Sequence, residues 1–228
     1  MEQKLNYRRY TRKNLKPGFF DFFYNLSITN WIIFINVVFF IFALILFSYN
    51  SELIDYVALK PANILGLKNI WTLLTSMFMH GNFSHLFVNM ISLMFIGNFV
   101  EKVIGRKRFF WFYMISGLVA GLFFVSLAFI FKTELDIYAV GASGAIFGLG
   151  GLLMILTPKL PVLVFFIIPM PMWAAMLFLL FGLWIISSIA GLPIGNTAHL
   201  GGLVVGVIFG LYLRNKYKRK VSMLNRMF

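Results

Sequence analysis

Long apolar runs alternate with shorter polar segments along most of this chain. Six of these runs, each 16 to 23 residues long, contain no Asp, Glu, Lys or Arg. A helix of about 20 apolar residues crosses the ~30 Å hydrocarbon core of a bilayer. The pattern therefore predicts an all-α, polytopic membrane protein with a bundle of six transmembrane helices, at residues 31–47, 84–100, 109–131, 142–157, 172–190 and 197–213.

Two connections between these runs differ from simple loops. The connection that ends near Gly81 has about 30 residues and is half apolar, which is too long for a passive loop. We expect it to pack against the bundle or the membrane interface. Residues 161–171 are apolar but contain Pro169 and Pro171, which interrupt a helix, so this segment is predicted to lie on the surface.

The composition decides which partners the chain can have. With 61% hydrophobic and 12% charged residues, the chain is not a soluble domain. A net charge of +13 would suggest nucleic acid, but the basic residues flank the apolar runs, as membrane topology requires. The predicted surroundings are therefore a lipid bilayer, with no nucleic acid. The absence of cysteine excludes disulfides, thiolate metal sites and a cysteine nucleophile.

The distribution of Lys and Arg predicts the orientation. With the N-terminus inside, 17 of these residues fall on inside segments and 3 on outside ones, so both termini are expected in the cytoplasm of a multi-pass cell-membrane protein. The first run lacks a small-x-small cleavage site and is predicted to be a retained anchor. The predicted organisation is a basic and aromatic cytoplasmic segment (1–30), a membrane domain (31–213) and a basic cytoplasmic tail (214–228).

The fourth and sixth runs are short for a membrane span. At 16 and 17 residues they cover roughly 25 Å, less than the hydrocarbon core. If their inner ends reach the cytoplasmic interface, their outer ends stop within the membrane. Ser143 lies at the outer end of the fourth run and His199 at the outer end of the sixth. The two side chains are therefore predicted to lie at similar depth on the same side.

The fourth run opens with Gly141-Ala142-Ser143-Gly144, which places a serine between small residues at a helix start. In membrane helices such small residues more often mean close packing than chemistry. However, His199, Gly202 and Gly206 share one helical face. Two glycine-lined faces let helix backbones approach closely enough for a hydroxyl to reach an imidazole. A neutral histidine can then take the serine proton and return it to a leaving amine.

The second run offers two hydrogen-bond donors. His85 and Asn89 are four residues apart, so they share a helical face at the outer end. Acyl transfer needs donors of this kind around the oxygen that becomes negative in the tetrahedral intermediate. The alternative is that both residues only make hydrogen bonds between helices.

Other hydrolytic sites fit these residues less well. A zinc protease motif needs two histidines four apart with a glutamate base, whereas His80 and His85 are five apart with no glutamate between them. An aspartyl protease needs aspartates within the spans, and none lies there. A three-histidine metal site between helices stays open. What remains is a Ser–His pair, with Asp136 as a conceivable partner for His199.

Together these motifs resemble the rhomboid family of intramembrane serine proteases over nearly all of residues 30–213. The resemblance rests on Trp71 with His80-Gly81, His85-x-x-x-Asn89, Gly141-Ala142-Ser143-Gly144 and Ala198-His199-x-x-Gly202-x-x-x-Gly206, in the family's order. It implies Ser143 as nucleophile and His199 as general base and acid. It also implies an oxyanion hole formed by His85, Asn89 and the Ser143 backbone N–H. Phe147 would pack against His199, His80 would shape the first loop, and the glycines at 141, 144, 202 and 206 would pack the site.

The resemblance further implies cleavage of single-span membrane proteins near the extracytoplasmic face, with no metal and no cofactor. Two positions depart from the family's common pattern. Thr72 stands where the family often has arginine, which puts the anchoring of the first loop in question, and Phe147 stands where it often has tyrosine. The alternative function is a catalytically silent rhomboid-like protein that binds membrane clients.

Overall fold

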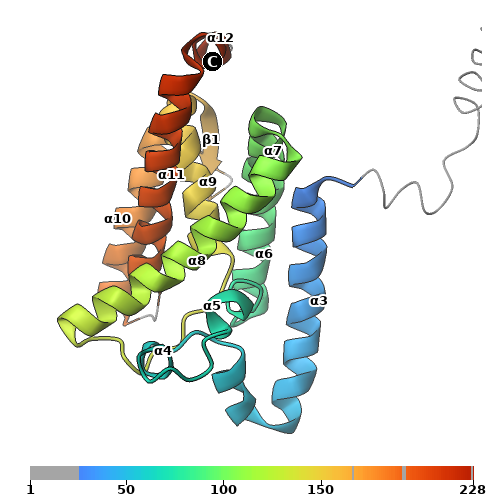
Figure 1. Ribbon diagram of the computed structural model, residues 1–228, viewed down its shortest axis with the longest axis vertical. Helices are drawn as coiled ribbons and strands as arrows, with labels where there is room; N and C mark the ends of the chain where they lie inside the picture. The colour runs from blue at the N-terminus through green and yellow to red at the C-terminus, as the bar shows by residue number, and fades with distance from the viewer. Residues whose placement is uncertain (1–25, 166, 192–193, 227) are drawn as a thin grey trace, which may run out of the picture.

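The computed structural model describes residues 26–165, 167–191, 194–226 and 228, so most of the predicted N-terminal segment lies outside the described residues. Within them the chain is mostly helical (Figure 1). Five helical stretches are long and apolar enough to cross a membrane. They are α3 (Ile28–Tyr49), the continuous stretch Phe83–Ile104, α8 (Arg106–Phe131), α10 (Met172–Ala190) and α11 (Asn196–Lys216); α9 (Ser143–Leu156) is apolar but shorter.

All six predicted apolar runs are helical, and the main differences lie at their ends. The stretch Phe83–Ile104 consists of α6 (Phe83–Ser92), a π-helical segment η2 (Leu93–Gly97) and α7 (Asn98–Ile104). The sixth helix was predicted to be short, and this was wrong, because α11 has 21 residues. Its last turn contains Arg214 and Lys216, which extend the helix past the apolar run and are favourable near the negative end of the helix dipole.

A short hairpin corrects the strictly all-α prediction. Strands β1 (Pro161–Val164) and β2 (Ile168–Pro171) pair antiparallel, with Pro161 opposite Pro171. Proline has no N–H to donate, so it is tolerated at the ends and edges of strands but not inside a helix. The predicted surface segment is therefore a two-stranded ribbon, and Leu163 and Ile168 in it are exposed.

Helix α9 is the central element of the bundle. It contacts α8, α10 and α11, and most of its side chains are buried. In Figure 1 α10 and α11 lie on one side of α9, α8 crosses the bundle obliquely, and α3 lies on the far side. Both α9 and α11 begin at the end of the molecule toward α4 and α5, so the two helices run in the same direction.

The long connection before α6 is structured. It contains the 3₁₀-helix η1 (Ser51–Tyr56), α4 (Pro61–Leu65) and α5 (Thr72–Thr75). These elements gather at one end of the bundle, and α12 (Lys218–Asn225) lies at the other (Figure 1). The connection also pairs with the segment before α9, through backbone hydrogen bonds in both directions between Leu59 and Ala139.

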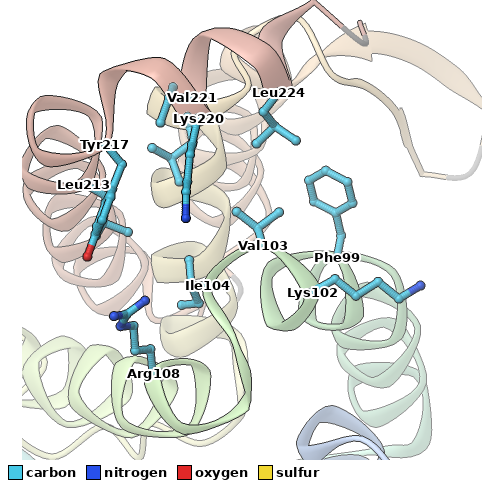
Figure 2. A pocket seen from close by; sticks show the side chains of 11 residues that line it. Phe99, Lys102, Val103, Ile104, Arg108, Leu213, Tyr217, Lys220, Val221 and Leu224 are labelled. Atoms are coloured by element: carbon cyan, nitrogen blue, oxygen red, sulfur yellow. The ribbon is translucent and has the colours of Figure 1, made fainter.

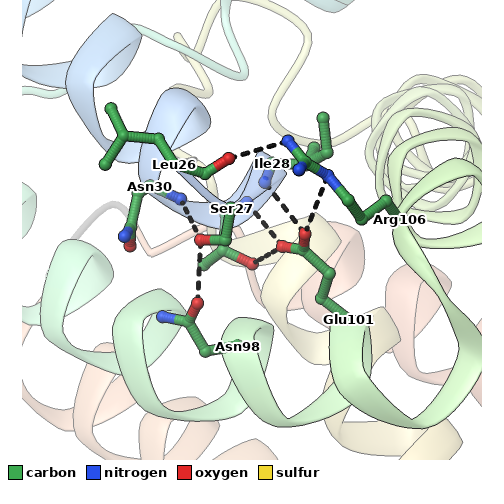
Figure 3. A network of polar contacts seen from close by, with 8 residues as sticks. Leu26, Ser27, Ile28, Asn30, Asn98, Glu101 and Arg106 are labelled. Carbon is green, nitrogen blue, oxygen red and sulfur yellow. Dashed lines mark hydrogen bonds and ion pairs between the residues drawn. The ribbon is translucent and has the colours of Figure 1, made fainter. Parts of the chain in front are cut away.

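A buried carboxylate attaches the start of α3 to α7 (Figure 3). Glu101 accepts hydrogen bonds from the backbone N–H groups of Ile28 and Thr29, at 2.9 and 2.8 Å, and from the Thr29 hydroxyl at 2.7 Å. Arg106 lies 3.7 Å from the same carboxylate. The first N–H groups of a helix have no intrahelical partner and carry partial positive charge. Glu101 therefore satisfies and neutralises the start of a helix from a distant part of the chain.

Candidate functional site

Ser143 and His199 are in direct contact. Ser143 is the first residue of α9, and His199 lies in the first turn of α11. The Ser143 Oγ and the His199 Nε2 are 2.8 Å apart, a hydrogen-bond distance, and His199 is only 6% exposed. A serine hydroxyl that shares its proton with a buried neutral imidazole is the arrangement that general-base activation requires.

Phe147 orients the imidazole. The Phe147 and His199 rings stack with centroids 4.4 Å apart and planes 13° apart. Phe147 lies one helical turn after Ser143, so the same helix face that carries the hydroxyl also supports the ring it bonds to. This is the packing predicted for Phe147, and it uses the ring and not a hydroxyl.

Glycines allow α9 and α11 to come this close. A β-carbon on Gly202 would collide with the carbonyl group of Gly144, and one on Gly206 would collide with the carbonyl of Gly148. On its other side α9 packs against α8, where a β-carbon on Gly144 would lie 2.7 Å from that of Ala120. Backbone contacts of this kind exclude any side chain larger than hydrogen.

The second helix brings His85 to the same place. Gly141 has φ +119°, a conformation that favours glycine, and its N–H donates to the Ser76 carbonyl at 2.8 Å. The position that a β-carbon of Gly141 would occupy is 2.8 Å from the His85 Nε2 and 3.7 Å from the Ser143 Oγ. The space beside Gly141 is thus bordered by an imidazole nitrogen and the candidate nucleophile.

Asn89 lies one turn below His85 and is buried. Its side-chain amide donates to the His85 carbonyl at 2.8 Å, so one of its two N–H bonds is used within its own helix. The start of α6 is capped by Asn82, whose side-chain oxygen accepts a hydrogen bond from the His85 N–H at 2.8 Å. This capping residue was not among the predicted site residues, although an Asn three residues before a polar helical position is a common start signal.

His80 supports His85 from the preceding loop. The two rings meet edge to face at 5.1 Å, and His80 is only 2% exposed. Burial, with a smaller contribution from His85, lowers the pKa of His80 from 6.5 to about 3. His80 is therefore neutral at physiological pH.

No carboxylate reaches the second nitrogen of His199. The Nδ1 is buried and has no hydrogen-bond partner among the described residues. Asp136, the conceivable partner, is exposed and pairs with Lys60 at 3.3 Å. In the same described part of the chain, no three His, Cys, Asp or Glu side chains come together as a metal site would need. Ser143 and His199 thus form a pair without a third, acidic residue, and the stacked Phe147 ring orients the imidazole instead.

The first loop is anchored without the arginine common in the family. Thr72 is buried and its hydroxyl donates to the Asn69 carbonyl at 2.7 Å, while the Trp71 indole donates to the Tyr56 carbonyl at 3.0 Å. Asp55 accepts from the Tyr138 hydroxyl at 2.8 Å, a bond that lowers the pKa of Asp55. The bonds of Thr72 and Trp71 lie within the loop, and the bond of Asp55 to Tyr138 joins the loop to the segment before α9.

Sequence reasoning missed the part of α8 that faces α9. Ser116 packs against Gly148, and Ala120 packs against Gly144. A signal was present, because small residues stand at 116, 117, 120 and 121, the four-residue repeat typical of close helix pairs. Ser143, His199 and Phe147 are in contact and His85 borders Gly141, whereas the described bond of Asn89 stays within its own helix. The chemical roles of all these residues stay predictions.

Comparison with known proteins shows which family the chain is similar to. A model of the rhomboid domain matches residues 67–216. The chain is 32% identical over 152 residues to the mitochondrial rhomboid protein 1 of Saccharomyces cerevisiae, an alignment covering 65% of this chain and 43% of that protein. It is 36% identical over 158 residues to RHOMBOID-like protein 2 of Arabidopsis thaliana (68% and 46%), and 27% identical over 218 residues to the rhomboid protease AarA of Providencia stuartii (87% and 77%). The chain thus spans less than half the length of the yeast and plant relatives.

Proposed function

Because this chain belongs to the rhomboid family of multi-pass membrane proteins, we propose that it is an intramembrane serine endopeptidase with Ser143 as nucleophile and His199 as general base. The observation that carries the proposal is the 2.8 Å contact between the Ser143 Oγ and the His199 Nε2. The Oγ attacks the scissile carbonyl as its proton passes to Nε2. His199 then gives this proton to the departing amine, which leaves the acyl group bound to Ser143 as an ester. A water molecule activated by the same nitrogen hydrolyses this ester.

The oxyanion of the tetrahedral intermediate needs fixed donors. The Ser143 backbone N–H has no intrahelical acceptor, because Ser143 is the first residue of α9. We assign the remaining donors to His85, whose Nε2 borders the space beside Gly141, and to the second N–H of the Asn89 amide. Asn89 need not break its bond to the His85 carbonyl to take part.

The proposed substrates are membrane proteins with a single span, cut near the extracytoplasmic face. With α9 counted as a span, we propose that six helices of the described residues cross the cell membrane and that both termini are cytoplasmic. The 14 residues of α9 cover about 21 Å, less than the hydrocarbon core, so Ser143 would lie below the outer surface. A helical peptide bond is hidden by its own hydrogen bonds, so a substrate helix must unwind locally before Ser143 can attack.

Labelling with a fluorophosphonate probe tests the nucleophile. The purified full-length protein is expected to label and to cleave a model single-span substrate, and Ser143→Ala is expected to lose both. His199→Ala should reduce cleavage by at least about 10³-fold, since the hydroxyl loses its base. Ser126→Ala, which removes an exposed hydroxyl on α8, is the matched control and should label normally.

Cleavage that persists in the Ser143→Ala protein would overturn the role of the serine. A wild-type protein that neither labels nor cleaves, yet retains membrane clients, would favour the silent client-binding alternative.

A further inference from the structure

A cavity of about 400 Å³ lies at the end of the bundle opposite the serine. It is bordered by α7, the start of α8, the ends of α9 and α11, and α12 (Figure 2). Its walls are mainly aliphatic and aromatic, from Phe99, Val103, Ile104, Leu156, Leu213, Tyr217, Val221 and Leu224. Three cationic side chains, Lys102, Arg108 and Lys220, complete the lining.

Two of these cations face each other. Figure 2 shows the Lys220 ammonium and the Arg108 guanidinium pointing toward one another into the cavity, whereas the Lys102 side chain points away from it. Among the described residues, no Asp or Glu lines the cavity. Both side chains are exposed, so water screens their mutual repulsion, and an anion between them would be attracted by both charges.

The acidic residue near the cavity, Glu101, already has other partners. Glu101 is held by the start of α3 and by Arg106. The other four acids within the described ranges, at positions 52, 55, 134 and 136, belong to the loops at the opposite end of the bundle. Neither Arg108 nor Lys220 forms an ion pair within the part of the chain that the structure describes. The described Asp and Glu side chains therefore supply no partner to Arg108 or Lys220.

Arg108 also borders a second and more apolar depression. This groove, of about 820 Å³, runs between α8 and α11 and is lined by Lys107, Arg108, Trp111, Phe112, Ile115, Val205, Ile208, Phe209 and Tyr212. Trp111 and Ile208 are more than half exposed, so the groove opens to the surroundings of the helices, which in a membrane are lipid chains. A cationic cavity and an apolar groove thus share one arginine.

We propose that this end of the bundle binds one anionic phospholipid. Its phosphate lies between Arg108 and Lys220, and one acyl chain lies in the groove between α8 and α11. Arginine forms paired hydrogen bonds to phosphate oxygens, and lysine adds a point charge. Basic pockets between membrane helices on the cytoplasmic side suit anionic headgroups. The groove distinguishes the ligand from a free anion, because inorganic phosphate has no chain to place there.

Binding can be measured by native mass spectrometry of the full-length protein in detergent, titrated with phosphatidylglycerol. The test variant is Arg108→Gln/Lys220→Gln. The control is Arg214→Gln/Lys218→Gln, which removes the same charge at the same end from exposed residues that line neither depression. We expect the test variant to bind roughly 30-fold more weakly, about fivefold for each cation lost, and the control to bind within about twofold of wild type. Lys220→Gln alone, on the peripheral helix α12, should show an intermediate loss and guards against misfolding of the double variant.

Two other probes distinguish the source of the phosphate. Phosphatidylcholine has the same chains without net charge, and inorganic phosphate has the charge without chains. Preference for phosphatidylglycerol over both supports the proposal. Equal binding of phosphatidylcholine, displacement of the lipid by millimolar inorganic phosphate, or equal losses in the test and control variants would overturn it.

Discussion

At the residue scale, the three histidines of the chain make two contacts near the start of α9, one between His199 and Ser143 and one between His80 and His85. His199 bonds to the serine, His85 borders the space beside Gly141, and His80 supports His85 from behind. His80 is too buried to contact a substrate directly. We therefore predict a positioning role for His80 and an effect of its protonation state on stability.

Acidification should destabilise the folded protein through His80. Its folded pKa of about 3 lies below the ordinary value of 6.5, so between these pH values the unfolded chain binds the proton more tightly. The contribution of neutral, buried His80 to folding stability is fully present above pH 6.5 and is lost as the pH falls toward 3. From pH 7 to pH 5 this residue should cost about 2 kcal/mol of unfolding free energy.

Thermal unfolding in detergent at pH 7 and pH 5 measures this effect. The comparison is with His80→Gln, which keeps a polar side chain but cannot titrate, so the other histidines contribute equally to both proteins. An equal loss of stability in wild type and variant would show that His80 is not the group responsible.

At the scale of elements, the close contact between α9 and α11 holds Ser143 next to His199. Gly202 and Gly206 meet carbonyl groups of α9, and His199 stands one turn before Gly202 on the same face. Any change that separates the two helices also separates the imidazole from the hydroxyl. The glycines should therefore matter for both stability and cleavage.

Gly202→Ala should lower the free energy of unfolding by about 1–3 kcal/mol, as overpacked interiors do, and should reduce cleavage. Gly182→Ala is the matched control, because a β-carbon there meets nothing within 4 Å. In the control, alanine is expected to be neutral or stabilising by up to about 1 kcal/mol, since it favours the helix. Unfolding titrations of both variants test the contrast, and equal stability of the two would refute the close helix contact.

The attachment of α3 depends on Glu101. Glu101→Gln keeps the shape of the side chain but places an amide NH₂ near backbone N–H donors and removes the negative charge at the helix start. We expect a loss of about 1–3 kcal/mol, the cost of buried donors left without an acceptor. Glu52→Gln, at an exposed position, serves as control. Hydrogen exchange of the first turn of α3 should increase only in the Glu101 variant; unchanged exchange there would contradict this account.

At the scale of the whole molecule, charge divides the described bundle into two ends. The cluster at the start of α8 and the residues of α11 and α12 make one end basic, while four of the five acids in the described ranges lie at the other. The serine lies toward the end that carries these acids. The positive-inside rule predicts that this end faces away from the cytoplasm.

The absence of cysteine makes this orientation directly testable. A single cysteine introduced as Glu52→Cys should react with a membrane-impermeant maleimide in intact cells. Ser222→Cys, on α12, should react only after the membrane is permeabilised. Both positions are exposed, so a difference in labelling reports orientation and not burial. Labelling of Ser222→Cys in intact cells would reverse the proposed topology.

The sequence predicted the helices well and their packing poorly. Apolar runs and flanking charges are local consequences of bilayer thickness, so the approximate bounds of the six apolar helices followed from the pattern of these runs. The short helices η1, α4, α5 and α12 were not predicted. The hairpin at 161–171, the π-helical segment at 93–97 and the added turn of α11 were not predicted. Each depends on how nearby backbone groups pair, which the pattern of apolar and polar residues does not specify.

The sequence by itself determined that this is a membrane protein with a serine, a histidine and small residues at helix starts. Only the tertiary structure decided that Ser143 and His199, 56 residues apart, are within 2.8 Å, because this distance depends on the depth and rotation of two helices against each other. It also decided that Phe147 and not Asp136 contacts the imidazole, and that Glu101 holds the start of α3. Hydrophobic spacing is set residue by residue, whereas the direction of a polar side chain is set by the helices packed around it.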